Sequence, residues 1–229
     1  MEVASVEQLL DNVIFESLAG AQSRFAEGPP HARRYRRGIA GLAGFADRAH
    51  PDFDALAPFC EAGEPMYCIG WTGKAPPRWR IVADTAVHQF VWDAPPPHDP
   101  ADAAIRLAPA HVDRMVALAA LTRPGPFGPG NFDLGEFYGV LEGESRLAMA
   151  GERLEAGPLR EVSAVCTRQG FEGRGLARRL MERVVRAQLA RGQVPFLHVM
   201  DANARARDIY ARMGFRHHQQ LPLRVVARA

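Results

Sequence analysis

The sequence predicts an α+β fold with a mixed, mostly antiparallel sheet flanked by helices. Three observations support this prediction. Short apolar runs typical of strands recur along the chain, and two segments with helical spacing each end at a glycine, Gly192 and Gly214. Glu142-Gly143-Glu144 separates two strand-like runs and predicts a hairpin. Residues 102–229 are therefore expected to form a strand, a helix, three strands, a helix, a strand, a helix and a strand, in that order.

The elements of this second half are bounded by turn residues. Strands are expected at Ala104–Leu107, Phe137–Leu141, Ser145–Ala150, Glu161–Thr167, Phe196–Met200 and Leu221–Ala227. Helices are expected at Pro109–Leu121, at Leu176–Arg191 and through Ala206–Met213. Residues 123–131, rich in proline and glycine, are expected to form a loop.

The first half has a weaker pattern. Apolar residues at helical spacing predict an amphipathic helix over residues 5–18, and strands are expected at Met66–Trp71, Trp79–Ala83 and Val87–Trp92. Residues 25–64 give no clear pattern. A proline-rich run from Asp93 to Pro100 cannot continue a helix or a central strand. We therefore divide the chain into an N-terminal α+β region (1–92), a linker (93–101) and a second domain (102–229).

Composition excludes several classes of protein. The chain has 229 residues, 47% of them hydrophobic and 24% charged, with a formal net charge of +2, so it can bury a normal core and is not a typical nucleic-acid binder. No apolar stretch approaches the roughly 18 residues of a membrane span, and no signal peptide is visible. The three cysteines form no CxxC pair and no zinc spacing, which indicates a reducing, cytoplasmic location and no metal site.

A glycine-rich segment follows the expected strand Glu161–Thr167 and precedes a helix. Gly170, Gly173 and Gly175 let backbone N–H groups converge, and the helix N-terminus adds unpaired donors, so the segment predicts a pyrophosphate site. It is neither a Walker loop nor a dinucleotide fingerprint, because its glycines follow the order GxxGxG. Arg174 and Arg178 lie close enough in sequence to add positive charge. An ordinary strand-to-helix turn is the alternative.

A second motif makes that alternative weaker. The segment from Asn203 to Phe215 fits N-x-x-A-x-x-[IL]-Y-x-x-x-G-F, and Glu172–Ala177 fits the small positions of [QR]-x-x-G-x-[GA]. At this spacing, the pair resembles the GNAT superfamily of acyl-CoA-dependent N-acetyltransferases, in a bacterial branch with an extra N-terminal half. Glu172 departs from the usual Gln or Arg, but that position contributes mainly a backbone amide.

The resemblance covers residues 102–229 and implies a GNAT-like fold in which Val162–Thr167 splays from Phe196–Met200 to hold acetyl-CoA as cosubstrate. Main-chain groups of Val165 and Thr167 would bind the pantetheine arm, and Asn203 would contact the thioester end. We further hypothesise that residues 1–92 are a degenerate copy of the same fold. The full set of expected cofactor-binding residues is Val165, Cys166, Thr167, Glu172, Gly173, Arg174, Gly175, Leu176, Ala177, Arg178 and Asn203.

Acyl transfer from a thioester to an amine needs a proton donor for the departing thiolate and a neutral amine. The resemblance places the hydroxyl of Tyr210 near the leaving sulfur, although Tyr210 also fits a buried helical stripe. Glu161 lies eleven positions before Glu172, the offset of the glutamate base in the histone-acetyltransferase branch. Desolvation in a cleft can raise the pKa of such a glutamate. An exposed edge residue, with water taking the proton, is the alternative.

Other reactive side chains have simpler interpretations. Cys166 suggests an acyl-thiol intermediate, but no histidine lies near it in sequence, so a small buried strand residue and direct attack on the thioester are expected. His198 is expected in the core or the cleft wall, and His217-His218 on a solvated strand. Arg33–Arg37 is expected to form a solvated face, with an acidic partner as the alternative. The loop with Phe127 either closes over the acceptor or is inert.

The sequence therefore predicts an N-acetyltransferase that joins acetyl-CoA to a primary amine by direct attack in a ternary complex. The acceptor is expected to be a small molecule or a peptide, bound by a monomer or a homodimer, without nucleic acid or membrane. A non-catalytic acyl-CoA-binding module is the rival from another class, and a longer acyl group is a third possibility.

Overall fold

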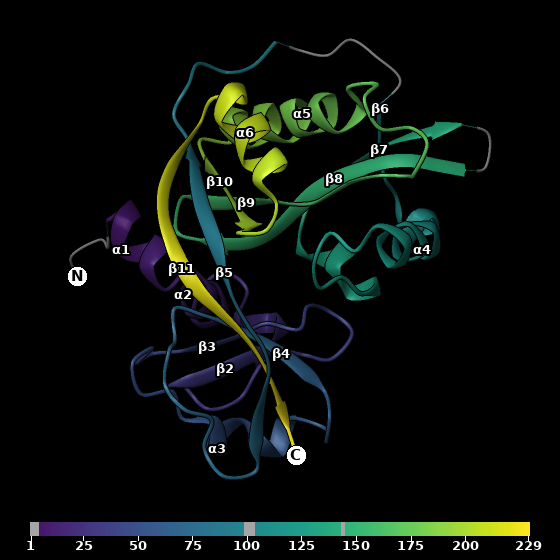
Figure 1. Cartoon of the computed structure of the whole chain (residues 1–229). Helices are drawn as coiled ribbons and strands as arrows, with labels where there is room; N and C mark the ends of the chain where they lie inside the picture. Colours follow the sequence, from purple (N-terminus) through teal and green to yellow (C-terminus); the bar gives the residue numbers. More distant parts are fainter. Residues whose placement is uncertain (1–4, 99–103, 143–144) are drawn as a thin grey trace.

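A computed structural model of the chain describes residues 5–98, 104–142 and 145–229, without the side chains of residues 142–147. Part of the expected linker and most of the turn Glu142-Gly143-Glu144 lie outside the described residues. The chain has an upper and a lower α/β part, and the eight-stranded sheet extends through both (Figure 1). The strands are β1 (Ala26–Glu27), β2 (Ala32–Tyr35), β3 (Ala43–Phe45), β4 (Pro65–Ile69), β5 (Trp79–Trp92), β6 (Ala104–Arg106), β7 (Phe137–Glu142), β8 (Ser145–Ala156), β9 (Leu159–Thr167), β10 (Val194–Met200) and β11 (Phe215–Arg228).

The helices confirm most of the expected order. They are α1 (Val6–Asp11), α2 (Val13–Ala19), α3 (Phe53–Leu56), α4 (Val112–Thr122), α5 (Leu176–Ala190) and α6 (Ala204–Met213), with short 3-10 turns at Ser23–Phe25, Ala57–Phe59, Pro109–His111 and Pro129–Leu134. From β6 onward, the strands and α-helices follow one another in the predicted order. Glycines in the left-handed region follow α5 and α6, at Gly192 (φ 72°) and Gly214 (φ 113°), which is why these helices stop where the sequence indicates.

The single helix expected over residues 5–18 is two short helices. Ser5 and Gln8 form a capping box at the start of α1. Asn12 then interrupts the helix, and its side-chain amide donates to the carbonyl of Phe45 on β3 at 2.8 Å. The tertiary bond overrides the helical periodicity, since an asparagine side chain competes well for backbone partners. Residues 25–64, which gave no pattern, hold the small antiparallel sheet β1-β2-β3 and α3.

The main sheet has eight strands within the described residues, in the order β4-β11-β5-β10-β9-β8-β7-β6. Its neighbours are antiparallel except β9 and β10, which are parallel. Two sequence predictions are wrong here. Residues 79–92 form one strand rather than two, and β11 begins at Phe215 rather than Leu221, because β5 and β11 pair along almost their whole length.

This long pairing joins the two regions that the sequence analysis separated at residue 92. β5 comes from the N-terminal region but lies between β10 and β11 of the second one. In Figure 1, β5 and the yellow β11 run side by side from the upper part, which holds α5 and α6, into the lower part, which holds β2 and α3. Residues 1–92 and 102–229 therefore share a sheet, and their status as separate folding units stays a prediction.

Helices cover both faces of the sheet around β10. Leu197 and Val199 pack in one cluster with Leu180 and Val184 of α5. Phe196 packs in another cluster, with side chains of α1 and α2 such as Leu10 and Leu18. Because successive strand residues point to opposite faces, β10 is buried on both sides, which explains its nearly continuous apolar sequence. In the part of the chain that the structure describes, no helix is long and apolar enough to cross a membrane.

The arginine run 33–37 corrects the expectation of a solvated face. Arg34 lies on β2, is 1% exposed, and donates through Nη1 to Glu64 at 2.8 Å and to the carbonyl of Phe59 at 2.8 Å. Tyr35 is fully buried. Arg37 pairs with Glu61 at the surface. Arg34 of this run therefore forms a buried ion pair with Glu64, which connects β2 to the segment before β4.

Candidate functional site

Strands β9 and β10 pair over only three residues and then part. The pairs are Val194 with Leu159, Pro195 with Arg160, and Phe196 with Glu161. Beyond Glu161, β9 continues to pair with β8 on its other side. The residues of β9 from Val162 onward therefore present an unpaired backbone edge toward β10. This confirms the predicted split between the two central strands.

A bulge in β9 accompanies the split. The register with β8 shifts between Met149 and Gly151, and Ala164 lies in the left-handed region at φ 53°. That conformation is strained for a residue with a Cβ. It interrupts the pairing of β9 with β8 between Ser163 and Cys166, beside Val165 and Thr167, which the sequence predicts to bind an extended ligand. A bulge of this kind commonly re-aims strand residues beside a binding site.

The glycine-rich segment has the backbone that the sequence predicts for an anion site. Gly170, Gly173 and Gly175 have φ values of 87°, 78° and 74°. Gly175 is the N-cap of α5, which has 15 residues. Nothing lies within 4 Å of the Cβ position at any of the three glycines, so backbone conformation alone requires glycine there. The first turn of α5 starts at Leu176 and Ala177 with no side-chain cap, which leaves its N–H groups without that partner.

Side chains around this segment are already engaged with one another. The guanidinium of Arg174 lies 4.5 Å from the ring centre of Phe171, and Arg178 pairs with Glu182 at 2.9 Å one turn further along α5. The carboxylate of Glu172, the residue that departs from the family motif, accepts a hydrogen bond from the Gly170 amide at 2.7 Å. This hydrogen bond, which the sequence did not predict, connects Glu172 to the start of the glycine-rich segment.

A cavity of about 330 Å³ opens where the strands part. It brings together three residues of the predicted site: Val165 on β9, Asn203 before α6, and Tyr210 on α6. Asn203 caps α6, with Oδ1 accepting from the amide of Ala206 at 3.1 Å. The other wall of the cavity includes Leu42, Tyr67, Ile69 and Arg153, which the sequence analysis did not assign to a site, and Arg123, Pro124, Gly125 and Pro126 of the loop that it considered as a cover over the acceptor. His198 also lines it, as expected for a cleft-wall residue.

Tyr210 lies between the hydrophobic core and the cavity. Its ring packs against the α5 cluster, with its centre 6.2 Å from that of Phe215, and the side chain also lines the cavity. Burial raises the pKa of the Tyr210 phenol to about 12. The hydroxyl therefore keeps its proton at neutral pH, which is the state that a proton donor needs.

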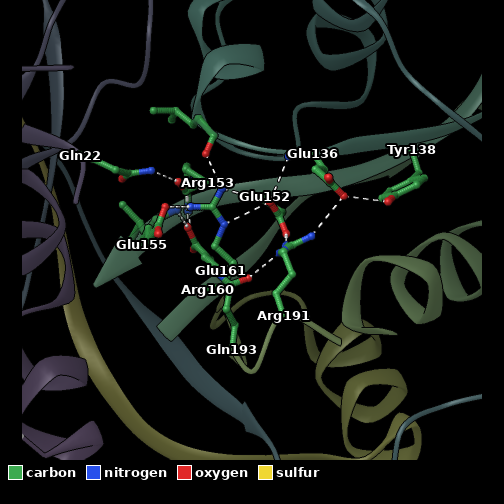
Figure 2. A network of polar contacts seen from close by, with 12 residues as sticks. Gln22, Glu136, Tyr138, Glu152, Arg153, Glu155, Arg160, Glu161, Arg191 and Gln193 are labelled. Carbon is green, nitrogen blue, oxygen red and sulfur yellow. Dashed lines mark hydrogen bonds and ion pairs between the residues drawn. The ribbon is translucent and has the colours of Figure 1, made fainter. Parts of the chain in front are cut away.

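Glu161 differs from its predicted surroundings. It is 1% exposed and is not among the described residues that line the cavity. Its carboxylate accepts two bonds from Arg153, from Nε at 2.8 Å and from Nη2 at 2.7 Å (Figure 2). Burial alone raises the pKa of Glu161, but the Arg153 charge and its hydrogen bonds outweigh it and hold the pKa well below the usual range. The expected raised pKa is therefore wrong.

His198 connects this buried carboxylate to the cavity. Its Nδ1 lies 2.8 Å from Oε1 of Glu161, and its Nε2 lies 3.2 Å from the amide nitrogen of Gln89. Gln89 is oriented by two further bonds, because Nε2 donates to the carbonyl of Leu10 at 3.1 Å and Oε1 accepts from Gln219 at 2.9 Å. Since an ionised carboxylate only accepts, these bonds fit a neutral ring with its hydrogen on Nδ1.

A row of polar side chains thus crosses five neighbouring strands. Its members are Gln219 on β11, Gln89 on β5, His198 on β10, Glu161 on β9 and Arg153 on β8. Sequence reasoning missed the row as a unit, because the five residues are far apart in the chain and only strand register brings them together. Gln89 pairs with His198 across β5 and β10, and with Gln219 across β5 and β11.

Cys166 and His217, which the sequence analysis considered as a nucleophile and a metal ligand, lie outside the cavity lining. Cys166 is 7% exposed and packs with Met115 and Phe137. His217 lies 3.0 Å from His88, which contacts Asp201 at 2.8 Å. In residues 5–98, 104–142 and 145–229, no group of three or more His, Cys, Asp or Glu is placed to hold a metal ion.

The proline- and glycine-rich loop is anchored at one end and lines the cavity at the other. Gly130 donates to the carbonyl of Gly38 at 2.8 Å, and Phe127 packs edge-on against Phe137. Residues 123–126 line the cavity. The loop therefore forms a wall of the cavity, and closure over an acceptor stays a prediction.

Comparisons with known proteins show which family this chain belongs to. The model of the FR47-like protein family matches residues 137–222. A GNAT-family protein from Novosphingobium aromaticivorans is 32% identical over 96% of this chain and 98% of its own, with a TM-score of 0.86. A GCN5-related N-acetyltransferase-like protein from Streptococcus suis is 14% identical over 95% of this chain and 92% of its own, with a TM-score of 0.60, a likeness of fold alone. No curated protein matches the sequence. The chain belongs to the GNAT superfamily of acyltransferases, which use an acyl-CoA as cosubstrate.

Proposed function

We propose that this acyltransferase moves an acetyl group from acetyl-CoA to a primary amine by direct attack in a ternary complex. The observation that carries the proposal is the cavity at the split between β9 and β10, which joins Val165 and Asn203 to Tyr210. An extended thioester arm along β9 would deliver its acyl group to that cavity. The acceptor amine would then approach from the side of Leu42 and Tyr67.

The backbone of β9 and the glycine-rich segment are assigned to the cosubstrate. Main-chain groups of Val165 and Thr167 would bind the pantetheine arm, with Cys166 between them contributing backbone only. Amides of residues 173–177 would hold the pyrophosphate at the positive end of α5, helped by Arg174 and Arg178. Asn203 would contact the thioester end with the amide hydrogens that its capping bond leaves available.

Tyr210 is assigned as the proton donor. The amine nitrogen attacks the thioester carbonyl carbon, the carbon–sulfur bond breaks, and the phenol proton goes to the departing thiolate. The Tyr210 phenol is protonated at neutral pH, so it has a proton to donate.

Glu161 remains a candidate base, but its surroundings favour another task. A carboxylate with a lowered pKa is a weak base. We infer that water takes the proton from the amine, and that ionised Glu161 orients His198 in the cavity wall through the 2.8 Å contact. Glu161 is then a positioning residue.

The test is release of free CoA from acetyl-CoA in the presence of amines. Turnover that falls in Tyr210→Phe, with acetyl-CoA binding retained, supports transfer and the acid role. Binding of acetyl-CoA without turnover on any amine favours the non-catalytic binding module instead. Cys60, Cys68 and Cys166 form no disulfide with one another, which fits the proposed cytoplasmic location.

A further inference from the structure

The charge of the cavity indicates what kind of amine it accepts. Its charged lining residues are Arg123 and Arg153, and among its lining residues in the described chain there is no aspartate or glutamate. Amines that carry several ammonium groups need carboxylates to replace the water that they lose on binding. The cavity offers cations instead, which selects against polyamines and similar acceptors.

Arg153 keeps one N–H group outside its ion pair with Glu161. The guanidinium uses Nε and Nη2 for the carboxylate, and within the described residues no hydrogen bond engages Nη1. Its side chain is 12% exposed and lines the cavity. The bidentate contact with Glu161 fixes the plane of the guanidinium, so the remaining N–H donors are pre-oriented.

Arg123 supplies a second, unpaired cation. None of the ion pairs or side-chain hydrogen bonds among the described residues involves Arg123, which is an exposed residue in the cavity wall. Its backbone ends α4 in the left-handed region, at φ 50° and ψ 57°. Glycine is the usual residue at such a helix end. An arginine is held there at a conformational cost and placed beside the cavity.

We propose that the acceptor is an amine that carries a carboxylate near its reacting nitrogen, as a free amino acid does, and that Arg123 and Nη1 of Arg153 bind this carboxylate. The inference rests on the proposed acetyl transfer. The apolar wall of Leu42, Ile69 and Leu223 suits a hydrophobic side chain on the same molecule. Arginine matches a planar carboxylate with two parallel N–H donors.

Three matched amines test the proposal. L-leucine has the carboxylate, L-leucinamide replaces it with an uncharged amide, and 3-methylbutylamine lacks it altogether. Spermidine serves as the polycationic comparison. CoA release is measured for each at several pH values, so that rates are compared at equal concentrations of neutral amine. We expect kcat/KM to be roughly 10- to 100-fold higher for L-leucine than for either analogue, the range of a charge-assisted hydrogen bond.

Variants at Arg123 assign the effect to the side chain. Arg123→Gln is expected to raise KM for L-leucine roughly 10-fold and to leave L-leucinamide unchanged. Arg123→Gly removes the cation and relaxes the left-handed backbone, so it should fold at least as well and show the same loss. Arg80→Gln is the matched control, because Arg80 is an exposed arginine on β5 that does not line the cavity.

Each result separates this inference from the proposed function. CoA release with all amines but no preference for the carboxylate overturns the inference and leaves acetyl transfer intact. A higher KM for acetyl-CoA in Arg123→Gln, equal for every amine, also overturns it, since the arginine would then serve the cosubstrate. Absence of CoA release with every amine would instead contradict the proposed function itself.

Discussion

Oε1 of Glu161 lies 2.8 Å from Nδ1 of His198, at the point where β9 and β10 stop pairing. The last backbone pair joins Glu161 to Phe196, two residues before His198. Beyond that pair the two strands lose their shared backbone bonds, and this side-chain contact holds them together at the closed end of the split. The contact therefore links the stability of the sheet to the geometry of the cavity wall.

Glu161→Gln should destabilise the fold by roughly 3–5 kcal/mol, because it leaves the Arg153 charge buried without its partner. Urea unfolding of wild type and Glu161→Gln at pH 7 measures this loss of unfolding free energy. Glu155→Gln is the matched control: Glu155 pairs with Arg160 at 2.5 Å, but its side chain is 34% exposed. The control should cost at most about 1 kcal/mol. Equal losses in the two variants would contradict the account of Glu161.

The same variant predicts a pH dependence with a definite sign. The pKa of Glu161 in the folded chain is lowered from 4.5, so its stabilising contribution is present above pH 4.5 and is lost as pH falls through the folded value. The stability difference between wild type and Glu161→Gln should be constant from about pH 8 to pH 5 and narrow below that range. A difference that narrows as pH rises would contradict the prediction.

Tyr210→Phe should lower kcat by roughly 100-fold or more, the range for loss of a positioned general acid. The dissociation constant of acetyl-CoA, measured by calorimetry, should not change. Since the pKa of Tyr210 is raised to about 12, wild-type kcat should show no loss from its deprotonation below about pH 10.

Tyr138→Phe is the control for this change. Burial likewise raises the pKa of Tyr138 to about 12, and its ring belongs to the same hydrophobic cluster, but its hydroxyl donates to Glu136 and does not line the cavity. Its kcat should stay within about twofold of wild type. A comparable fall in both variants would assign the effect to packing and remove the acid role.

Gly175→Ala and Gly192→Ala separate binding from folding at the two ends of α5. Gly175 and Gly192 have nearly equal φ values, 74° and 72°, and open space at the Cβ position. Each alanine should cost about 1 kcal/mol of stability, from left-handed strain. Only Gly175→Ala should weaken CoA binding, because only Gly175 belongs to the predicted pyrophosphate site. Equal CoA affinity in both variants would place that site elsewhere.

Local patterns explain what the sequence could predict. The glycine stops of α5 and α6, the glycine-rich segment and the motif around Tyr210 each depend on a few consecutive residues, and these parts of the fold are confirmed. Sequence also placed Val165, Asn203 and Tyr210 in one site, and the cavity unites them.

The features that the sequence could not predict depend on pairing between strands that are far apart in the chain. β5 is continuous through Asp84 because β11 supplies partners along its whole length, including the bond from Arg224 to Asp84 at 3.1 Å. The pKa of Glu161 depends on Arg153, eight residues away on a neighbouring strand. No local pattern encodes either partner, since both contacts follow from strand register.

Unfolding with added ligands tests the central claim most directly, that the split between β9 and β10 binds an acyl-CoA. Acetyl-CoA, CoA, ATP and NAD are added separately at equal concentration. Acetyl-CoA or CoA at a hundred times its dissociation constant should raise the unfolding free energy by roughly 2.7 kcal/mol. ATP and NAD should give no comparable rise. No stabilisation by either acetyl-CoA or CoA, or an equal rise with all four ligands, would contradict the account.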